Sequence, residues 1–149
     1  MLNRKGDGIV SQNEVKEQVL KVLDESKVGT LATVKDNKPY SRYMTYYHED
    51  LVLYTPTSKK TEKTDEIEEN PNVHILLGYE GEGYGDTFVE IEGKASIEQS
   101  EGYKKKIWND HMKDWFDGPE DPNLVVLKIE PVGIRLMNNE EDSPQTLDL

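Results

Sequence analysis

The sequence contains no cysteine among its 149 residues, which excludes disulfide bonds, thiolate metal ligands and a cysteine nucleophile. Hydrophobic residues are also scarce, at 34%, so the core of one subunit is modest, and we expect an oligomer that shares apolar surface. No apolar run approaches the roughly 20 residues of a membrane-spanning helix, and no signal-peptide core follows Met1. These absences favour a soluble, cytoplasmic protein.

Positive charge is scarce as well, because 18 lysines and arginines face 30 acidic residues and the net charge is −12. Nucleic-acid backbones and anionic membranes both require a basic face, so we expect neither as a partner. This charge also argues against a single-strand-binding barrel, which reads bases in a basic groove. The three histidines, His48, His74 and His111, lack the spacing of a helical zinc site, and we predict no metal site.

Hydrophobic alternation predicts a single, mainly β domain over residues 1–149 with short helices at the crossings. β-rich runs predict strands at 28–34, 40–47, 51–55, 73–77, 87–97, 124–129 and 132–137. Capping residues and helical spacing predict helices from Ser11 or Asn13 to about 26, from Thr61 or Thr64 to 69, and from Ser100 to about 115. Tight turns between the first three strands predict an antiparallel meander, and the whole pattern favours a small closed barrel of six or seven strands. We expect residues 1–10 to be frayed and residues 138–149 to form a loose acidic tail.

Cations gather in one short stretch, against the charge of the rest of the chain. Arg42 lies on the second predicted strand, and an inward guanidinium needs an anion because an unpaired buried charge is too unfavourable. Thr61 and Lys63 begin the next helix, where free amides and the helix dipole favour an anion. Two interpretations stay open: a site for a dianionic phosphate, or a surface arginine paired with one of the 30 carboxylates beside solvated lysines.

The pattern over this stretch resembles the FMN-binding split barrel, the superfamily of pyridoxamine 5′-phosphate oxidase. The residues that carry the likeness are Arg42, Met44, Tyr54, Thr55, Thr61, Lys63, Glu66, Ile67, Asn70 and Pro71. The loop at residues 115–122 resembles the general stress protein 26 branch of that superfamily. The likeness runs from about Val15 to Met137, nearly the whole chain.

The resemblance implies a homodimer of antiparallel split barrels with two flavin sites at the subunit interface. It implies that Arg42 and Lys63 hold the FMN phosphate and that the backbone near Met44 follows the ring system. Trp108 would close the pocket from the partner subunit. The hydroxyl donors to the phosphate would be Thr55, Thr57 and Thr61. The hydroxyl of Tyr54, at the end of the third predicted strand, can also donate to phosphate oxygens.

The chain also departs from the oxidase pattern. Glu62 stands where the oxidase commonly has a second basic residue, so Lys59 or Lys60 is expected to substitute for it. Thr87 and Phe88 stand where the oxidase carries arginine and glutamine. These differences argue against pyridoxamine-phosphate oxidase activity itself and leave FMN binding as the expectation.

The sequence therefore predicts an FMN-binding oxidoreductase that receives a hydride from a reduced nicotinamide or a small substrate. The cofactor carries that chemistry, so no side chain is predicted to be catalytic. FAD is the alternative cofactor. Two other functions stay open: a stress protein that sequesters or senses flavin without turnover, and a split-barrel dimer that has lost its cofactor.

Overall fold

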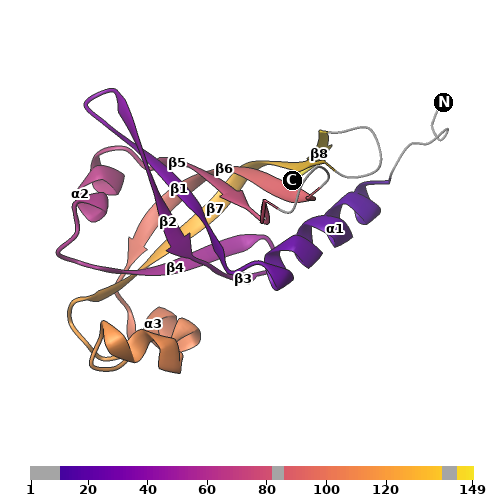
Figure 1. The fold of residues 1–149 in the computed structure, drawn as a ribbon. Coiled ribbons are helices and arrows are strands. Elements are labelled where there is room, and N and C mark those ends of the chain that lie inside the picture. The colour runs from indigo at the N-terminus through magenta and orange to yellow at the C-terminus, as the bar shows by residue number, and fades with distance from the viewer. Residues whose placement is uncertain (1–10, 82–85, 139–143) are drawn as a thin grey trace.

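A computed structural model of the chain describes residues 11–81, 86–138 and 144–149, and its strands form one curled antiparallel sheet (Figure 1). The hydrogen-bonded order is β2-β1-β5-β6-β7-β4-β3, with β8 paired to β7. The strands are β1 (Val28–Lys35), β2 (Lys38–Thr45), β3 (Tyr47–Glu49), β4 (Val52–Ser58), β5 (Asn72–Leu77), β6 (Phe88–Glu98), β7 (Leu124–Met137) and β8 (Gln145–Leu147). The helices are α1 (Gln12–Glu25), α2 (Glu62–Glu69), α3 (Glu101–Ile107) and the 3-10 helix η1 (Asp110–Asp114). The predicted mainly β architecture is confirmed.

The predicted meander is wrong in its third strand, because β4 pairs with β7 and not with β2. The cause lies at Tyr46, which is buried between β2 and β3. Its backbone N–H donates to the carbonyl of Lys27, and its hydroxyl donates to the carbonyl of Thr30. Burying this side chain interrupts the predicted strand 40–47, and the backbone of β4 forms its ladders with β3 and β7.

The barrel is split between β2 and β4, so the expectation of a closed barrel is also wrong. Among the described residues, no backbone ladder joins these two strands. A side chain makes the connection instead, since the hydroxyl of Thr55 on β4 donates to the carbonyl of Thr45 on β2 at 2.7 Å. The ends of β2 and β4 are thereby held side by side while their backbones remain separate.

Two further boundaries differ from the prediction. The strands expected at 124–129 and 132–137 are one strand, β7, which continues through Pro131. Proline has no N–H for a ladder bond, and the register of β6 and β7 shifts beside it. Glu92 pairs with Gly133 and Gly93 with Pro131, which leaves Val132 of β7 as the extra residue. The helix expected from Ser100 to about 115 stops at Ile107, and a separate turn, η1, follows.

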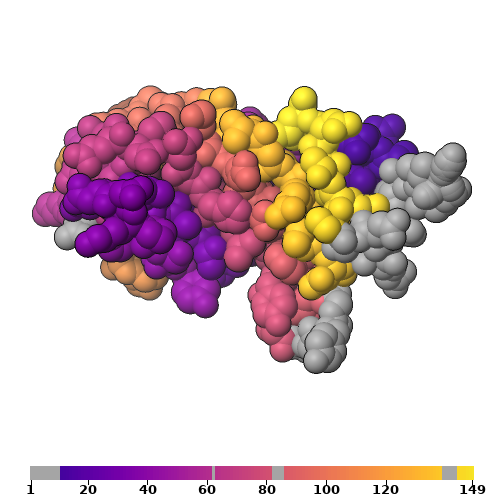
Figure 2. Space-filling view, turned by 90° about the horizontal axis from the view of Figure 1, so that it is seen from above, coloured from indigo at the N-terminus to yellow at the C-terminus, as the bar shows by residue number. Residues whose placement is uncertain are grey.

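The C-terminal residues are part of the fold where a loose tail was expected. Strand β8 pairs with β7, and Leu147 is buried. Gln12 of α1 donates to the carbonyl of Thr146 and accepts from the N–H of Asp148, so the first helix and the last strand lie together (Figure 2). The predicted frayed segment 1–10 and residues 139–143 of the acidic tail lie outside the described residues.

Two apolar clusters hold the sheet. The larger one fills the inside of the curl, where Leu31 of β1, Ile91 of β6 and Ile129 of β7 are fully buried and α1 packs with Val19. The smaller one contains Tyr54, Ile107 and Met112 with the first residues of β7. It packs α3 and η1 against β4, where Tyr54 is the buried member of the cluster. No helix in the described part of the chain is long and apolar enough to cross a membrane.

Gly29 on β1 lies where no side chain fits. A Cβ atom there would come within 2.5 Å of the carbonyl oxygen of Leu76 and 2.6 Å of a methyl of Leu77. We therefore expect Gly29→Ala to lower the free energy of unfolding by about 1–3 kcal/mol, as overpacking does, in urea denaturation.

Gly102→Ala provides the matched control. Gly102 lies in α3, and its added Cβ would meet only the Ser100 hydroxyl at 3.9 Å. Because alanine is the better helix former, this variant should gain up to about 1 kcal/mol. Equal stability of the two variants would contradict the close approach at Gly29.

Candidate functional site

A pocket of about 510 Å³ opens where the ends of β2 and β4 meet η1. Its volume lies in the range of roughly 300–1,000 Å³ that is usual for small-molecule and cofactor sites. The lining residues are Val28, Tyr43, Met44, Thr45, Tyr47, Pro56, Thr57, Ser58, Thr61, Lys63, His111, Met112, Trp115 and Phe116. Aromatic and apolar side chains face a group of hydroxyls with one lysine. Such a pocket suits a flat, largely apolar ligand with an anionic end.

The hydroxyl side of the pocket is a loop that is folded by its own hydrogen bonds. The Thr61 hydroxyl donates to the carbonyl of Ser58 at 2.9 Å and lies 3.4 Å from the hydroxyl of Thr57. The Ser58 hydroxyl accepts from the N–H of Lys60 at 3.2 Å. Thr61 is also the N-cap residue of α2, but its side chain makes no capping bond. The three hydroxyls thus lie beside the N-terminus of α2.

Lys63, in the first turn of α2, is the cation of this pocket. No hydrogen bond or ion pair joins its ammonium to any residue in the described ranges. Its pKa lies below the ordinary value of 10.5, chiefly because burial removes water from the ammonium and secondly because Arg42 repels it, while Glu66 opposes the shift. An anionic ligand would stabilise this partly buried ammonium, because no anion of the protein is paired with it in the described ranges.

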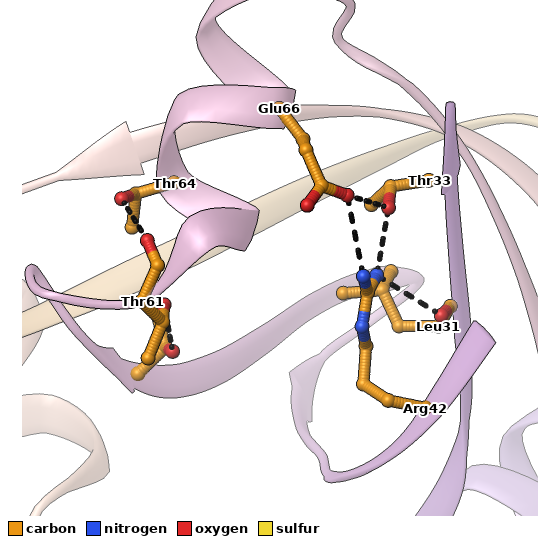
Figure 3. Close-up of polar contacts among 7 residues, drawn as sticks. Leu31, Thr33, Arg42, Thr61, Thr64 and Glu66 are labelled. Carbon is orange, nitrogen blue, oxygen red and sulfur yellow. Dashed lines mark hydrogen bonds and ion pairs between the residues drawn. The ribbon is translucent and has the colours of Figure 1, made fainter. Parts of the chain in front are cut away.

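Arg42 pairs with an anion of the protein itself, the carboxylate of Glu66 (Figure 3). Its guanidinium donates to the Thr33 hydroxyl at 2.8 Å, to a carboxylate oxygen of Glu66 at 3.3 Å and to the carbonyl of Leu31 at 3.4 Å. Arg42 is near enough to Lys63 to influence its pKa, but it is not among the residues that line the pocket.

Glu66 extends from α2 into the space between the helix and β1. Only 4% of the residue is exposed, and its carboxylate accepts from the Thr33 hydroxyl at 2.6 Å (Figure 3). Its pKa is lowered, first by that hydrogen bond and then by the hydrogen bond and charge of Arg42, against the opposing effect of burial. Glu66 is therefore a buried carboxylate that remains charged.

Four of the nine binding residues that the sequence suggested line the pocket together. They are Met44, Thr57, Thr61 and Lys63. Their side chains come from β2, from the end of β4 and from the start of α2, which the resemblance placed next to one another.

The other suggested residues are engaged elsewhere in the structure. Thr55 is fully buried and donates across the split of the barrel. Tyr54 packs in the smaller cluster, with the Lys106 ammonium 5.1 Å from its ring centroid. Lys60 is exposed, and Trp108 ends α3 and packs against the same cluster as Tyr54. Arg42 is held by Glu66.

One wall of the pocket was missed by the sequence interpretation. This wall comes from η1 and the two residues after it, and its lining residues are His111, Met112, Trp115 and Phe116. His111 was expected to be solvated, and Trp115 and Phe116 were expected in the core or an interface. The spacing i, i+1, i+4, i+5 was the available signal, because it places four side chains on one face of a helical turn.

Asn109 connects this wall to the sheet. Its side-chain oxygen accepts from the N–H of His111 at 3.0 Å, and its amide donates to the Tyr47 hydroxyl at 2.5 Å and to the carbonyl of Ile107 at 3.2 Å. Tyr47 itself lines the pocket. One side chain thus fixes the start of η1 and its distance from β3.

We expect Asn109→Ala to lower the free energy of unfolding by about 1 kcal/mol, the scale of a lost cap with its hydrogen bonds. Tryptophan fluorescence quenching by acrylamide should also increase, since Trp115 would be held less firmly. Asn72→Ala is the control, because Asn72 is exposed and its side chain makes two exposed hydrogen bonds, accepting from Lys94 and donating to Asn70. A loss no greater than that of the control would contradict the role of Asn109.

A profile of the pyridoxamine 5′-phosphate oxidase family matches residues 15–138 of this chain. General stress protein 26 from Bacillus subtilis strain 168 is 58% identical to it over 140 residues, which cover 94% of this chain and 100% of that protein. Both findings confirm the resemblance that the sequence motifs indicated.

Solved structures agree with this likeness. The crystal structure of general stress protein 26 from Bacillus anthracis strain Sterne superimposes with a TM-score of 0.80 at 41% identity, over 91% of this chain and 98% of that one. A FAD-binding protein from Mesorhizobium loti superimposes with a TM-score of 0.64 at 25% identity, over 79% of this chain and 90% of that one. The split-barrel fold is thereby confirmed.

Proposed function

We propose that this chain, which belongs to the pyridoxamine 5′-phosphate oxidase family, is an FMN-binding oxidoreductase whose cofactor lies in the pocket between β2, β4 and η1. The observation that carries the proposal is Lys63, a partly buried lysine with a lowered pKa and no anion of its own among the described residues. It lies beside three hydroxyls and a helix N-terminus at one end of an otherwise apolar pocket.

The residues present fit the two ends of a flavin nucleotide. Lys63, with the hydroxyls of Thr57, Ser58 and Thr61, would hold the phosphate by charge-assisted hydrogen bonds. The apolar and aromatic wall around Met44 would cover the ring system. When bound, the flavin supplies the hydride and electron chemistry, while these residues bind it, orient it and exclude water.

The phosphate corner favours FMN over FAD. FMN ends in a terminal phosphate dianion, for which one lysine and a set of hydroxyls are the matching partners. The FAD-binding neighbour from Mesorhizobium loti keeps FAD as the second candidate. Extraction of the bound flavin followed by mass spectrometry distinguishes the two cofactors.

A second copy of the chain would complete the pocket. Three lining residues at its mouth are exposed in the single chain: Val28 by 60%, Tyr43 by 79% and Trp115 by 74%. Large apolar side chains gathered at one opening are typical of a surface that another subunit covers. We propose a cytoplasmic homodimer with one flavin at each end of the interface, and light scattering during size-exclusion chromatography tests it.

The absorption spectrum of the purified protein tests the proposal directly. We expect flavin bands in the protein as isolated, or binding of added FMN that is tighter than binding of riboflavin. A folded protein that binds neither flavin would overturn the proposal. Steady oxidation of NADH or NADPH with an added acceptor would support an oxidoreductase; tight binding without turnover would indicate a flavin-sequestering stress protein.

A further inference from the structure

Arg42 pairs with an internal anion, the carboxylate of Glu66. The resemblance assigned Arg42 to the flavin phosphate, whereas in the structure its guanidinium donates to Glu66, to Thr33 and to a carbonyl of β1. The contact with Glu66 is an interior one, because Glu66 is buried and its second partner, Thr33, is fully buried as well. The carboxylate is thus a fixed, buried charge beside Arg42.

We propose that Glu66 competes with the flavin phosphate for Arg42 and thereby limits how tightly the pocket holds FMN. This inference rests on the proposed function, since it concerns the affinity of that same pocket. In this structure Arg42 pairs with Glu66. When FMN is bound, Arg42 turns toward the phosphate, and Glu66 keeps the hydrogen bond from Thr33.

The burial of the two partners supports this exchange. The side chain of Glu66 is 5% exposed and that of Arg42 is 25% exposed, so Arg42 is the partner with room to move. The arginine comes from an edge strand, β2, whereas Glu66 comes from a helix that packs on the sheet. Its 3.3 Å contact with Glu66 is also longer than the 2.6 Å bond that Glu66 accepts from Thr33. Releasing Arg42 therefore leaves the carboxylate with its shorter hydrogen bond.

The charges around Lys63 also support competition between Glu66 and the phosphate. Arg42 and Lys63 are positive and Glu66 is negative, and Lys35 also acts on Glu66 through its charge. A phosphate that enters beside Lys63 gains from both cations but is repelled by the buried carboxylate. Glu66 therefore acts against a charged ligand and leaves an uncharged one unaffected, which predicts an effect on FMN and none on riboflavin.

Glu66→Gln tests this, because glutamine retains the size and a carbonyl oxygen that accepts from Thr33. We expect it to bind FMN about tenfold more tightly than the control, on the scale of one charge-assisted hydrogen bond, with riboflavin affinity unchanged. The control is Glu68→Gln, an exposed position on the same helix that removes the same charge from the chain. Flavin fluorescence titration gives both affinities.

Three outcomes are informative. FMN binding by Glu66→Gln that is no tighter than by Glu68→Gln, or weaker, overturns the competition and makes Glu66 a residue that orients Arg42. An equal gain for riboflavin also overturns it, because the effect would not involve the phosphate. Failure of wild-type protein and both variants to bind either flavin instead refutes the proposed function.

A measurement on the unmodified protein covers the case in which Glu66→Gln does not fold. The side-chain N–H signal of Arg42 in an ¹⁵N-correlated spectrum, assigned from its loss in Arg42→Lys, reports the partner of the guanidinium. FMN should shift this signal and riboflavin should leave it in place. A signal that stays unchanged at saturating FMN would contradict the exchange of partners.

Discussion

Replacing Lys63 with glutamine is expected to weaken FMN binding about ten- to hundredfold while leaving riboflavin binding unchanged. Lys63 is the cation that lines the pocket, and one charge-assisted hydrogen bond contributes about 1.5–3 kcal/mol. FMN affinity should fall with rising salt concentration in the wild type and much less in the variant. Salt screens the attraction between Lys63 and the phosphate, and the variant lacks that attraction. Fluorescence titrations at low and high ionic strength measure both effects.

Lys60→Gln is the matched control, since Lys60 lies on the same loop but is exposed and does not line the pocket. Its FMN affinity should stay close to that of the wild type. The lowered pKa of Lys63 adds a dependence on pH: FMN affinity should fall as pH rises through that pKa, which lies below 10.5, and the variant should lack this fall. Equal losses in the two variants would show that Lys63 does not contact the phosphate.

Replacing Arg42 with methionine is expected to lower the free energy of unfolding by about 3 kcal/mol at neutral pH. The arginine is the only cation paired with Glu66 among the described residues, and breaking a buried ion pair by removing one partner costs about 3–5 kcal/mol. We take the lower end because Arg42 is partly exposed. Chemical denaturation monitored by circular dichroism measures the loss.

The loss should shrink as the solution is acidified. In the wild type the pKa of Glu66 is lowered in the folded state, so its stabilisation is present above the unfolded pKa and disappears as pH falls through the folded pKa. In the Arg42→Met variant the hydrogen bond from Thr33 still lowers the pKa of Glu66, but the lowering by Arg42 is lost. The pKa of Glu66 therefore lies higher than in the wild type, and the carboxylate takes up a proton sooner as the pH falls. A deficit of equal size at neutral and acidic pH would contradict this account.

A second substitution separates the charge from the packing of Arg42. Glu66→Gln in the Arg42→Met background should recover most of the lost stability, because no buried charge remains and Thr33 still has an acceptor. The same exchange in the wild-type background should recover nothing. Additive effects of the two substitutions would show that the residues act independently.

The local features of the fold could be predicted from the sequence, and the long-range pairing could not. The turn at Asp36 and Asn37 has positive φ at both residues, and it joins β1 to β2 as the pattern indicated. The partner of β4, however, lies about 70 residues further along the chain, in β7. Alternation indicates which face of a strand is buried, but it does not indicate which strand is the neighbour.

The candidate site shows the same limit at the level of single residues. Charge composition indicated correctly that Arg42 needs an anion. It did not decide whether that anion is a ligand phosphate or a carboxylate of the protein. Glu66, 24 positions away, is the internal partner because α2 lies over β1. The η1 wall was missed because a continuous helix was expected where α3 ends at Ile107 and the chain turns. Both outcomes depend on how the helices and strands pack against one another, and composition does not indicate that packing.

The pairing of β8 with β7 has a practical consequence for anyone shortening or tagging this protein. A chain truncated after Met137, where the acidic composition invites removal, would lose Leu147 from the interior and the two hydrogen bonds that hold Gln12. The first helix would lose its attachment together with the last strand. An affinity tag added after Leu149 would instead extend from a residue that is already exposed, without disturbing these contacts.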